Sequence, residues 1–88
     1  MLGMPNIGTT RELRLTQAEV GKIYEIVRLE GRGAIRRRIM DMGLIPKTKV
    51  KLVGVAPLGE PLNLEAKGFN LTIRKSEAST IIVKEVNE

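Results

Sequence analysis

The sequence contains no cysteine, no histidine and no tryptophan, and it has only one tyrosine and one phenylalanine. Without cysteine the chain forms no disulfide and offers no thiolate as a nucleophile or metal ligand. Without histidine it lacks the commonest general base and a preferred ligand of transition metals. These absences argue against catalysis and against a selective ferrous site within one chain. We therefore expect no enzymatic activity, no catalytic residue, no metal site and no cofactor.

Long apolar runs are also missing, since no stretch approaches the roughly twenty residues that span a bilayer. Residues 1–10 lack the basic start and apolar segment of a signal peptide. We expect them to be a flexible N-terminal tail, and residues 11–88 to fold as one small domain. A cytoplasmic location is the corresponding expectation.

The net charge is +5. This sign favours an acidic protein surface, a nucleic acid or an anionic membrane as partner, although the same charge also serves solubility alone. Much of this positive charge comes from five arginines within eleven residues, a stretch whose single carboxylate is Glu30. These arginines are Arg28, Arg32, Arg36, Arg37 and Arg38. They predict either a docking patch or an ordinary solvated helix face, with one of the three consecutive arginines turned partly toward the domain.

Short segments of alternating apolar and polar residues predict strands at 22–29, 49–55, 62–67, 71–74 and 80–86. Gly54 and the pair Ile26–Val27 are expected bulge sites, and residues 68–70 are an expected hairpin connection. Short helical turns are predicted at 16–19 and, with Ser76 as cap, at 76–79. Several short strands and one helix favour a mainly β fold, a small barrel of five to six strands.

One helix is predicted over Ala34–Met42. Its apolar stripe, at helical spacing, consists of Ile35, Ile39 and Met42. Gly43 is expected to end the helix in the left-handed region, and Pro46 cannot continue it. Met42 is assigned to the core and Met40 to a half-exposed position.

The loop after the third predicted strand is stiffened by Pro57 and Pro61, which bracket Leu58-Gly59-Glu60. Leu58 could insert into a pocket of a partner as an anchor, or fold back over one mouth of the barrel. A loop this constrained presents a fixed shape, which favours recognition.

Arg74 and Lys75 follow the last predicted hairpin. They either extend the basic surface, or Arg74 neutralises a nearby carboxylate such as Glu60 or Glu65, in a surface pair of small energetic value.

Three segments, Met42–Pro46, Val55–Pro61 and Leu71–Ala78, resemble successive signatures of the FeoA family in their order and spacing. The preceding Ala34–Ile39 also resembles the family's helix. This resemblance implies an SH3-like barrel with one inserted helix. It implies an accessory or regulatory protein that binds FeoB, the membrane ferrous iron transporter with a cytoplasmic GTPase domain. The sequence departs from the family pattern at two positions. Lys47 stands where the family often has glycine, so we expect that the turn does not require positive φ there. Glu60 stands where aspartate is usual.

The transporter is expected to meet the loop and the neighbouring arginine-bearing helix face. The candidate partner-binding residues are Arg36, Arg37, Pro57, Leu58, Gly59, Glu60, Arg74 and Lys75. The alternatives are a small basic barrel that binds nucleic acid, or the SH3-like module of an iron-dependent regulator. Base stacking needs aromatic side chains, and Tyr24 and Phe69 lie on separate elements, which argues against nucleic acid. Exposed edge strands favour a weak homo-oligomer.

Overall fold

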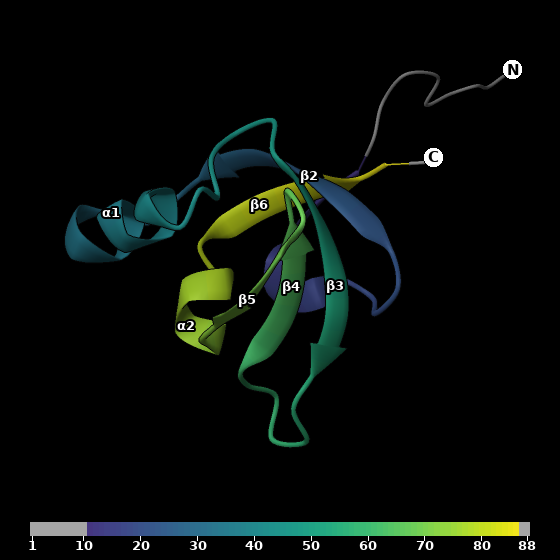
Figure 1. Cartoon of the computed structure of the whole chain (residues 1–88). Helices are drawn as coiled ribbons and strands as arrows, with labels where there is room; N and C mark the ends of the chain where they lie inside the picture. The colour runs from purple at the N-terminus through teal and green to yellow at the C-terminus, as the bar shows by residue number, and fades with distance from the viewer. Residues whose placement is uncertain (1–10, 87–88) are drawn as a thin grey trace, which may run out of the picture.

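The computed structural model describes residues 11–86, so the tail expected at 1–10 lies outside the described residues. This part of the chain contains six strands and three short helices, in the order β1-η1-β2-α1-β3-β4-β5-α2-β6 (Figure 1). The strands are β1 (Glu12–Arg14), β2 (Ile23–Leu29), β3 (Lys49–Val55), β4 (Leu62–Ala66), β5 (Phe69–Ile73) and β6 (Ile81–Glu85). The helices are the 3-10 turn η1 (Leu15–Gln17), α1 (Gly33–Asp41) and α2 (Lys75–Ala78).

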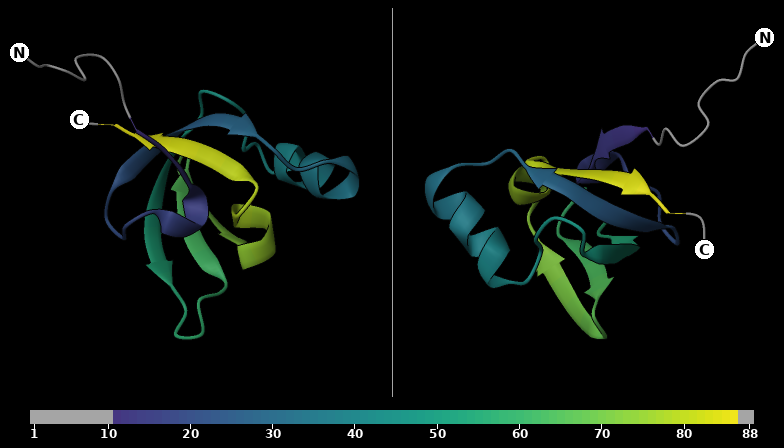
Figure 2. Two further views of the ribbon diagram at one scale, coloured as in Figure 1. Left: turned by 180° about the vertical axis from the view of Figure 1, so that it is seen from behind. Right: turned by 90° about the horizontal axis from the view of Figure 1, so that it is seen from above.

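All six strands belong to one antiparallel sheet with the order β1-β6-β2-β3-β4-β5. The sheet curls so that β3, β4 and β5 lie across from β6 and β2 (Figures 1 and 2). Its two edges, β1 and β5, do not pair with each other, so hydrogen bonds do not close the barrel. The prediction of a mainly β fold with five to six strands and one inserted helix is confirmed.

Two register shifts bend the sheet. The first lies on β2, between Ile26 and Arg28, and the second on β3, between Leu52 and Gly54. An extra residue on one strand increases the local twist and bends that strand. Both predicted bulge sites are therefore confirmed, and they lie on the two strands that turn the sheet over the core.

The core consists of aliphatic side chains from the inner face of the sheet and from the connections. Its largest fully buried members are Leu15, Ile26, Ile39, Leu44, Val50, Leu52, Leu64, Ile73, Ile81 and Val83. The one tyrosine, Tyr24, is buried as well, and its hydroxyl oxygen accepts a hydrogen bond from the Glu19 amide at 2.8 Å. Residues at alternate positions of short strands thus fill an interior that has no large aromatic cluster.

The end of α1 follows the sequence prediction. Gly43 has φ +88°, its amide donates to the Met40 carbonyl at 2.9 Å, and the Leu44 amide donates to the Ile39 carbonyl at 3.2 Å. These two bonds form a Schellman motif, which is accompanied by the burial of Ile39 and Leu44. The motif turns the chain from the helix into the core within two residues.

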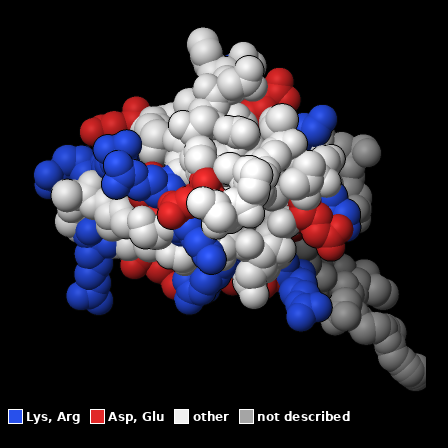
Figure 3. Space-filling view, turned by 90° about the horizontal axis from the view of Figure 1, so that it is seen from below, with Lys and Arg blue, Asp and Glu red and all other residues white. Residues whose placement is uncertain are grey.

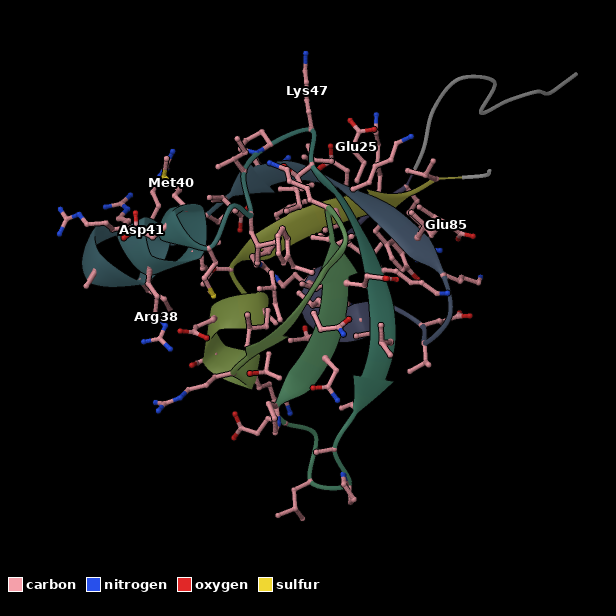
Figure 4. The ribbon with its side chains drawn as sticks, viewed as in Figure 1. Glu25, Arg38, Met40, Asp41, Lys47 and Glu85 are labelled. Atoms are coloured by element: carbon pink, nitrogen blue, oxygen red, sulfur yellow. The ribbon has the colours of Figure 1, made fainter. Side chains whose placement is uncertain are left out.

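Lys47 corrects an expectation, because it does adopt positive φ, at +77°. The Thr48 amide donates to the Ile45 carbonyl at 3.1 Å, and the Lys47 amide donates to the Ile26 carbonyl at 2.7 Å. Proline at the second residue and positive φ at the third are typical of a type II turn, in which Lys47 here takes the place that glycine usually has. The Lys47 side chain points away from the sheet (Figure 4).

The β4–β5 hairpin also differs from the prediction. Its turn is Lys67-Gly68, with φ of +52° and +83°, and Ala66 pairs with Phe69. Two consecutive positive φ values are typical of the type I′ turn, whose twist matches that of the strands. The connection expected at 68–70 is therefore wrong, because Phe69 and Asn70 already belong to β5.

The two short helical turns begin earlier than predicted. The Gln17 side chain accepts the Arg14 amide, and the Glu77 side chain accepts the Arg74 amide, each at 2.9 Å. A side-chain acceptor three residues on satisfies the first free amide of a helix. The predicted starts at Thr16 and Ser76 are wrong, because each turn follows directly on the end of a strand.

Ile39→Ala should lower the free energy of unfolding by about 2–4 kcal/mol, because it removes a fully buried side chain that joins α1 to the core. Ile39→Val, which removes one methylene, should cost only about 0.5–1.5 kcal/mol. Urea unfolding followed by circular dichroism measures both values. Equal stability of wild type and Ile39→Ala would contradict the assignment.

Candidate partner-binding surfaces

The β3–β4 loop projects beyond the end of the sheet (Figure 1). The Gly59 amide donates to the Ala56 carbonyl at 2.8 Å, and the Ala56 amide donates to the Pro61 carbonyl at 3.2 Å. Gly59 has φ +91°, a left-handed conformation that suits glycine. Leu58, at the tip, is 92% exposed. The reading in which Leu58 folds back over the barrel is therefore wrong, and the loop holds this apolar side chain in solvent.

The second half of the loop is tied to the start of α2. A Glu60 side-chain oxygen accepts a hydrogen bond from the Lys75 amide at 3.1 Å. No ion pair of the described residues joins Arg74 to Glu60 or Glu65, so that alternative is wrong. The loop, Arg74 and Lys75 thus lie together at one end of the molecule, with both basic residues exposed.

The three consecutive arginines of α1 have different environments. Arg38 Nε lies 2.8 Å from Glu77 Oε2, and the Glu77 side chain is only 7% exposed. The other Glu77 oxygen caps α2, so this one carboxylate joins α1 to the start of α2. Figure 4 shows Arg38 directed toward α2, on the side of the helix away from Met40. The expectation that one of the three arginines turns partly toward the domain is confirmed, although the Arg38 side chain remains 63% exposed.

Arg28 is also engaged, although it was expected to belong to the same cluster. It contacts Glu12 at 2.8 Å and Glu30 at 3.2 Å, and Arg14 contacts Glu30 at 3.0 Å. The hydrogen bond with Glu12 raises the pKa of Arg28, and the hydrogen bond from Arg14 lowers the pKa of Glu30. These exposed pairs link β1 to β2 and remove Arg28 from the basic patch.

The patch that remains on α1 comprises Arg36 and Arg37, which are exposed and have no ion pair with any described residue. Met40, 43% exposed, lies between them in a shallow depression that Gly33 and Asp41 complete. The half-exposed position predicted for Met40 is confirmed, but the sequence analysis did not assign this residue to a surface shared with the arginines. Its spacing of four and three residues from the arginines could have placed it on their face of the helix.

The loop and the α1 patch do not form one continuous surface. In Figures 1 and 2, α1 lies at one end of the molecule, the loop at another, and α2 between them. Figure 3, seen from the loop end, shows Lys and Arg gathered at the α1 end and a largely uncharged area in the middle. The helix face was expected to neighbour the loop, and the inserted α2 separates them.

None of the helices among residues 11–86 combines the length and the apolar character of a membrane-spanning segment. No three carboxylates of residues 11–86 gather in the manner of a metal site.

Residues 13–85 match the FeoA domain family. The chain belongs to the FeoA family. It is 35% identical over 72 residues to an Fe(2+) transport protein A/Fe(2+) transporter FeoB fusion protein of Porphyromonas gingivalis, a match that covers 82% of this chain and 8% of that protein. The chain therefore spans a small part of that relative, whose sequence associates the family with ferrous iron transport.

The structural relatives agree with this assignment. A FeoA-like protein from Clostridium acetobutylicum is 34% identical, with a TM-score of 0.82 over 90% of this chain and 92% of that one. The FeoA of Stenotrophomonas maltophilia, described as a prokaryotic SH3 domain protein, is 24% identical, with a TM-score of 0.71 over 81% of this chain and 88% of that one. The second likeness shows the fold alone, and it confirms the expected SH3-like architecture.

Glu77→Ala should lower the free energy of unfolding by about 1–2 kcal/mol, because it removes the cap of α2 and the contact with Arg38. Glu77→Gln keeps an acceptor for the Arg74 amide and loses only the charge. It should therefore cost less, within about 1 kcal/mol, as expected of a pair with one exposed partner. Chemical denaturation of both variants measures the difference, and equal losses would contradict the capping role.

Proposed function

We propose that this FeoA domain is a non-enzymatic cytoplasmic accessory protein that binds an FeoB-type ferrous iron transporter. The relative in which both parts share one chain supports this partner, because fusion keeps two interacting domains at high effective concentration. The absence of histidine and cysteine supports a binding role over a catalytic one.

The observation that carries the proposal is the exposure of Leu58 on a rigid loop. The Leu58 side chain is 92% exposed, so its burial by a partner would remove apolar surface from water and stabilise the complex. The turn hydrogen bonds around Ala56 and the tie from Glu60 to α2 already hold the loop in place. Binding therefore requires little further ordering, which is the advantage of a preorganised contact. Leu58 would be the anchor, and Pro57 and Gly59 would define the shape of the loop.

The α1 patch would act in a different manner. Arg36 and Arg37 have no acidic neighbour in an ion pair, so their field is available to an acidic surface of the transporter. Such charges mainly accelerate and orient association, and their effect falls with salt. Arg74 and Lys75 would add to this field at the loop end. Because α2 separates the two surfaces, we expect their contributions to be nearly additive.

Leu58→Ala should weaken binding to the cytoplasmic part of the transporter by about 1–2 kcal/mol, chiefly through faster dissociation. Surface plasmon resonance measures the two rate constants separately. Val20→Ala, which truncates another exposed apolar residue away from the loop, is the matched control and should leave both rates unchanged. Unaltered dissociation of Leu58→Ala would exclude the loop as the anchor.

Arg36→Glu combined with Arg37→Glu should slow association about tenfold or more at low salt and flatten its salt dependence, with a small effect on dissociation. The control pair is Arg11→Glu with Lys51→Glu, which changes the net charge equally at exposed positions outside α1. An equal effect of both pairs would show that only net charge matters.

The nucleic-acid alternative has little support from the described residues. Tyr24 is buried, whereas Phe69 is 70% exposed and lies on another strand, so the two rings form no stacking platform. Tight binding of single-stranded nucleic acid, together with transporter binding unaffected by the Leu58 and arginine variants, would replace the present proposal.

A further inference from the structure

We propose that the outer edge of β5 is a homotypic interaction site, at which β5 of a second copy of this chain adds as an antiparallel strand. The pairing would be centred on Leu71 and would join two six-stranded sheets into one. It is independent of the loop and of α1, and it does not require the transporter.

The edge offers free backbone groups. β5 pairs only with β4, and Figure 2 shows it at the border of the sheet. Because the type I′ turn makes Ala66–Phe69 a hydrogen-bonded pair, the groups of Phe69, Leu71 and Ile73 face β4. The amide and carbonyl groups of Asn70 and Thr72 then face outward. Both residues are exposed, and no backbone hydrogen bond outside the sheet involves them among residues 11–86.

The β5 edge lacks the sequence features that usually prevent edge strands of different molecules from pairing. Between Phe69 and Ile73 there is no charged residue, no proline and no register shift. The other edge, β1, has only three residues, and both Glu12 and Arg14 carry charge. Short length and charge are common ways of preventing unwanted pairing. β5 is therefore the open edge of this sheet.

The composition of β5 suits a second copy. In a twofold antiparallel pair centred on Leu71, each Asn70 faces Thr72 of the second copy, and the outward groups of both copies are satisfied. The two Leu71 side chains meet at the axis as a non-hydrogen-bonded pair, in which side chains approach most closely. Phe69, which is 70% exposed, then faces Ile73 of the second copy.

The charges near the strand permit this arrangement. Lys67 lies in the hairpin turn and Lys75 begins α2, so neither continues the paired strand. The positive charge of these lysines and Arg74 is partly offset by two carboxylates. Glu65 lies on β4 opposite Asn70, and Glu60 accepts a hydrogen bond from the Lys75 amide. One pair of short strands buries less than the roughly 1,200 Å² of a stable interface, so the dimer should be weak.

The absence of cysteine makes a direct test available. Asn70→Cys and Thr72→Cys are prepared separately, at exposed positions that leave the core intact. In the proposed register these two positions face each other across the dimer, at a Cα separation of about 5.5 Å, which a disulfide spans. A mixture of the two variants at about 0.5 mM, a concentration chosen for a weak dimer, should form the mixed disulfide at least about fivefold faster than either variant alone. Glu12→Cys, on the charged edge, controls for random collision.

Concentration-dependent protection of the Asn70 and Thr72 amides from hydrogen exchange gives a second readout. Thr72→Pro, which removes an outward amide and leaves the β4 bonds in place, should abolish the protection of the remaining Asn70 amide and keep the melting temperature within a few degrees of wild type. Faster cross-linking of one variant with itself would overturn the register. Monomer at millimolar concentration, or protection that appears only after transporter is added, would overturn the pairing of two copies.

Discussion

A single short sheet has to enclose the whole core of this FeoA domain, and that requirement determines the rest of the structure. The core has no large aromatic cluster, so aliphatic side chains must be brought together from both halves of the sheet. The register shifts on β2 and β3 bend the sheet enough to do this. The elements that the core does not need, namely the β3–β4 loop and most of α1, are left to project into solvent, where they can meet other molecules.

The junction of α1 with the domain rests on two contacts of different kinds. Ile39 and Leu44 bury apolar surface where the helix ends, and Arg38 reaches the nearly buried carboxylate of Glu77. The adjacent Arg36 and Arg37 take no part in this junction. Of the three consecutive arginines, Arg38 thus holds the helix against the domain, and Arg36 and Arg37 form its exposed surface. A charge reversal at Arg36 and Arg37 therefore reports on binding and not on folding.

Local patterns in the sequence were sufficient for much of the fold. Alternation located five of the six strands to within about two residues, but it missed β1, which has only three residues. Gly43 marked the end of α1 because a left-handed glycine there lets the next amides bond to the last carbonyls of the helix. Predictions failed where the environment decided the conformation. Lys47 adopts positive φ because β2 fixes its amide, and the hairpin turn lies one residue earlier because the twist of the strands selects a two-residue connection.

The candidate surfaces were predictable in part. The prolines predicted a rigid loop but left open whether Leu58 projects or folds back, and the structure shows it exposed. The separate roles of the arginines depend on contacts distant in sequence. Arg38 meets Glu77, and Arg28 meets Glu12, across connections that no local pattern encodes. The distance between the loop and α1 likewise depends on how the sheet curls, which brings α2 between them.

The pairing of β1 with β6 has a consequence for covalent attachment. Glu12 lies opposite Lys84, so the first described strand begins beside the end of the last one. A tether joined before β1 or after β6 would leave from the same corner of the domain, which Figure 1 shows at the side opposite the β3–β4 loop and away from α1. Either direction of gene fusion would therefore give the same mechanical linkage, and a tethered domain would still present its loop and its basic helix outward.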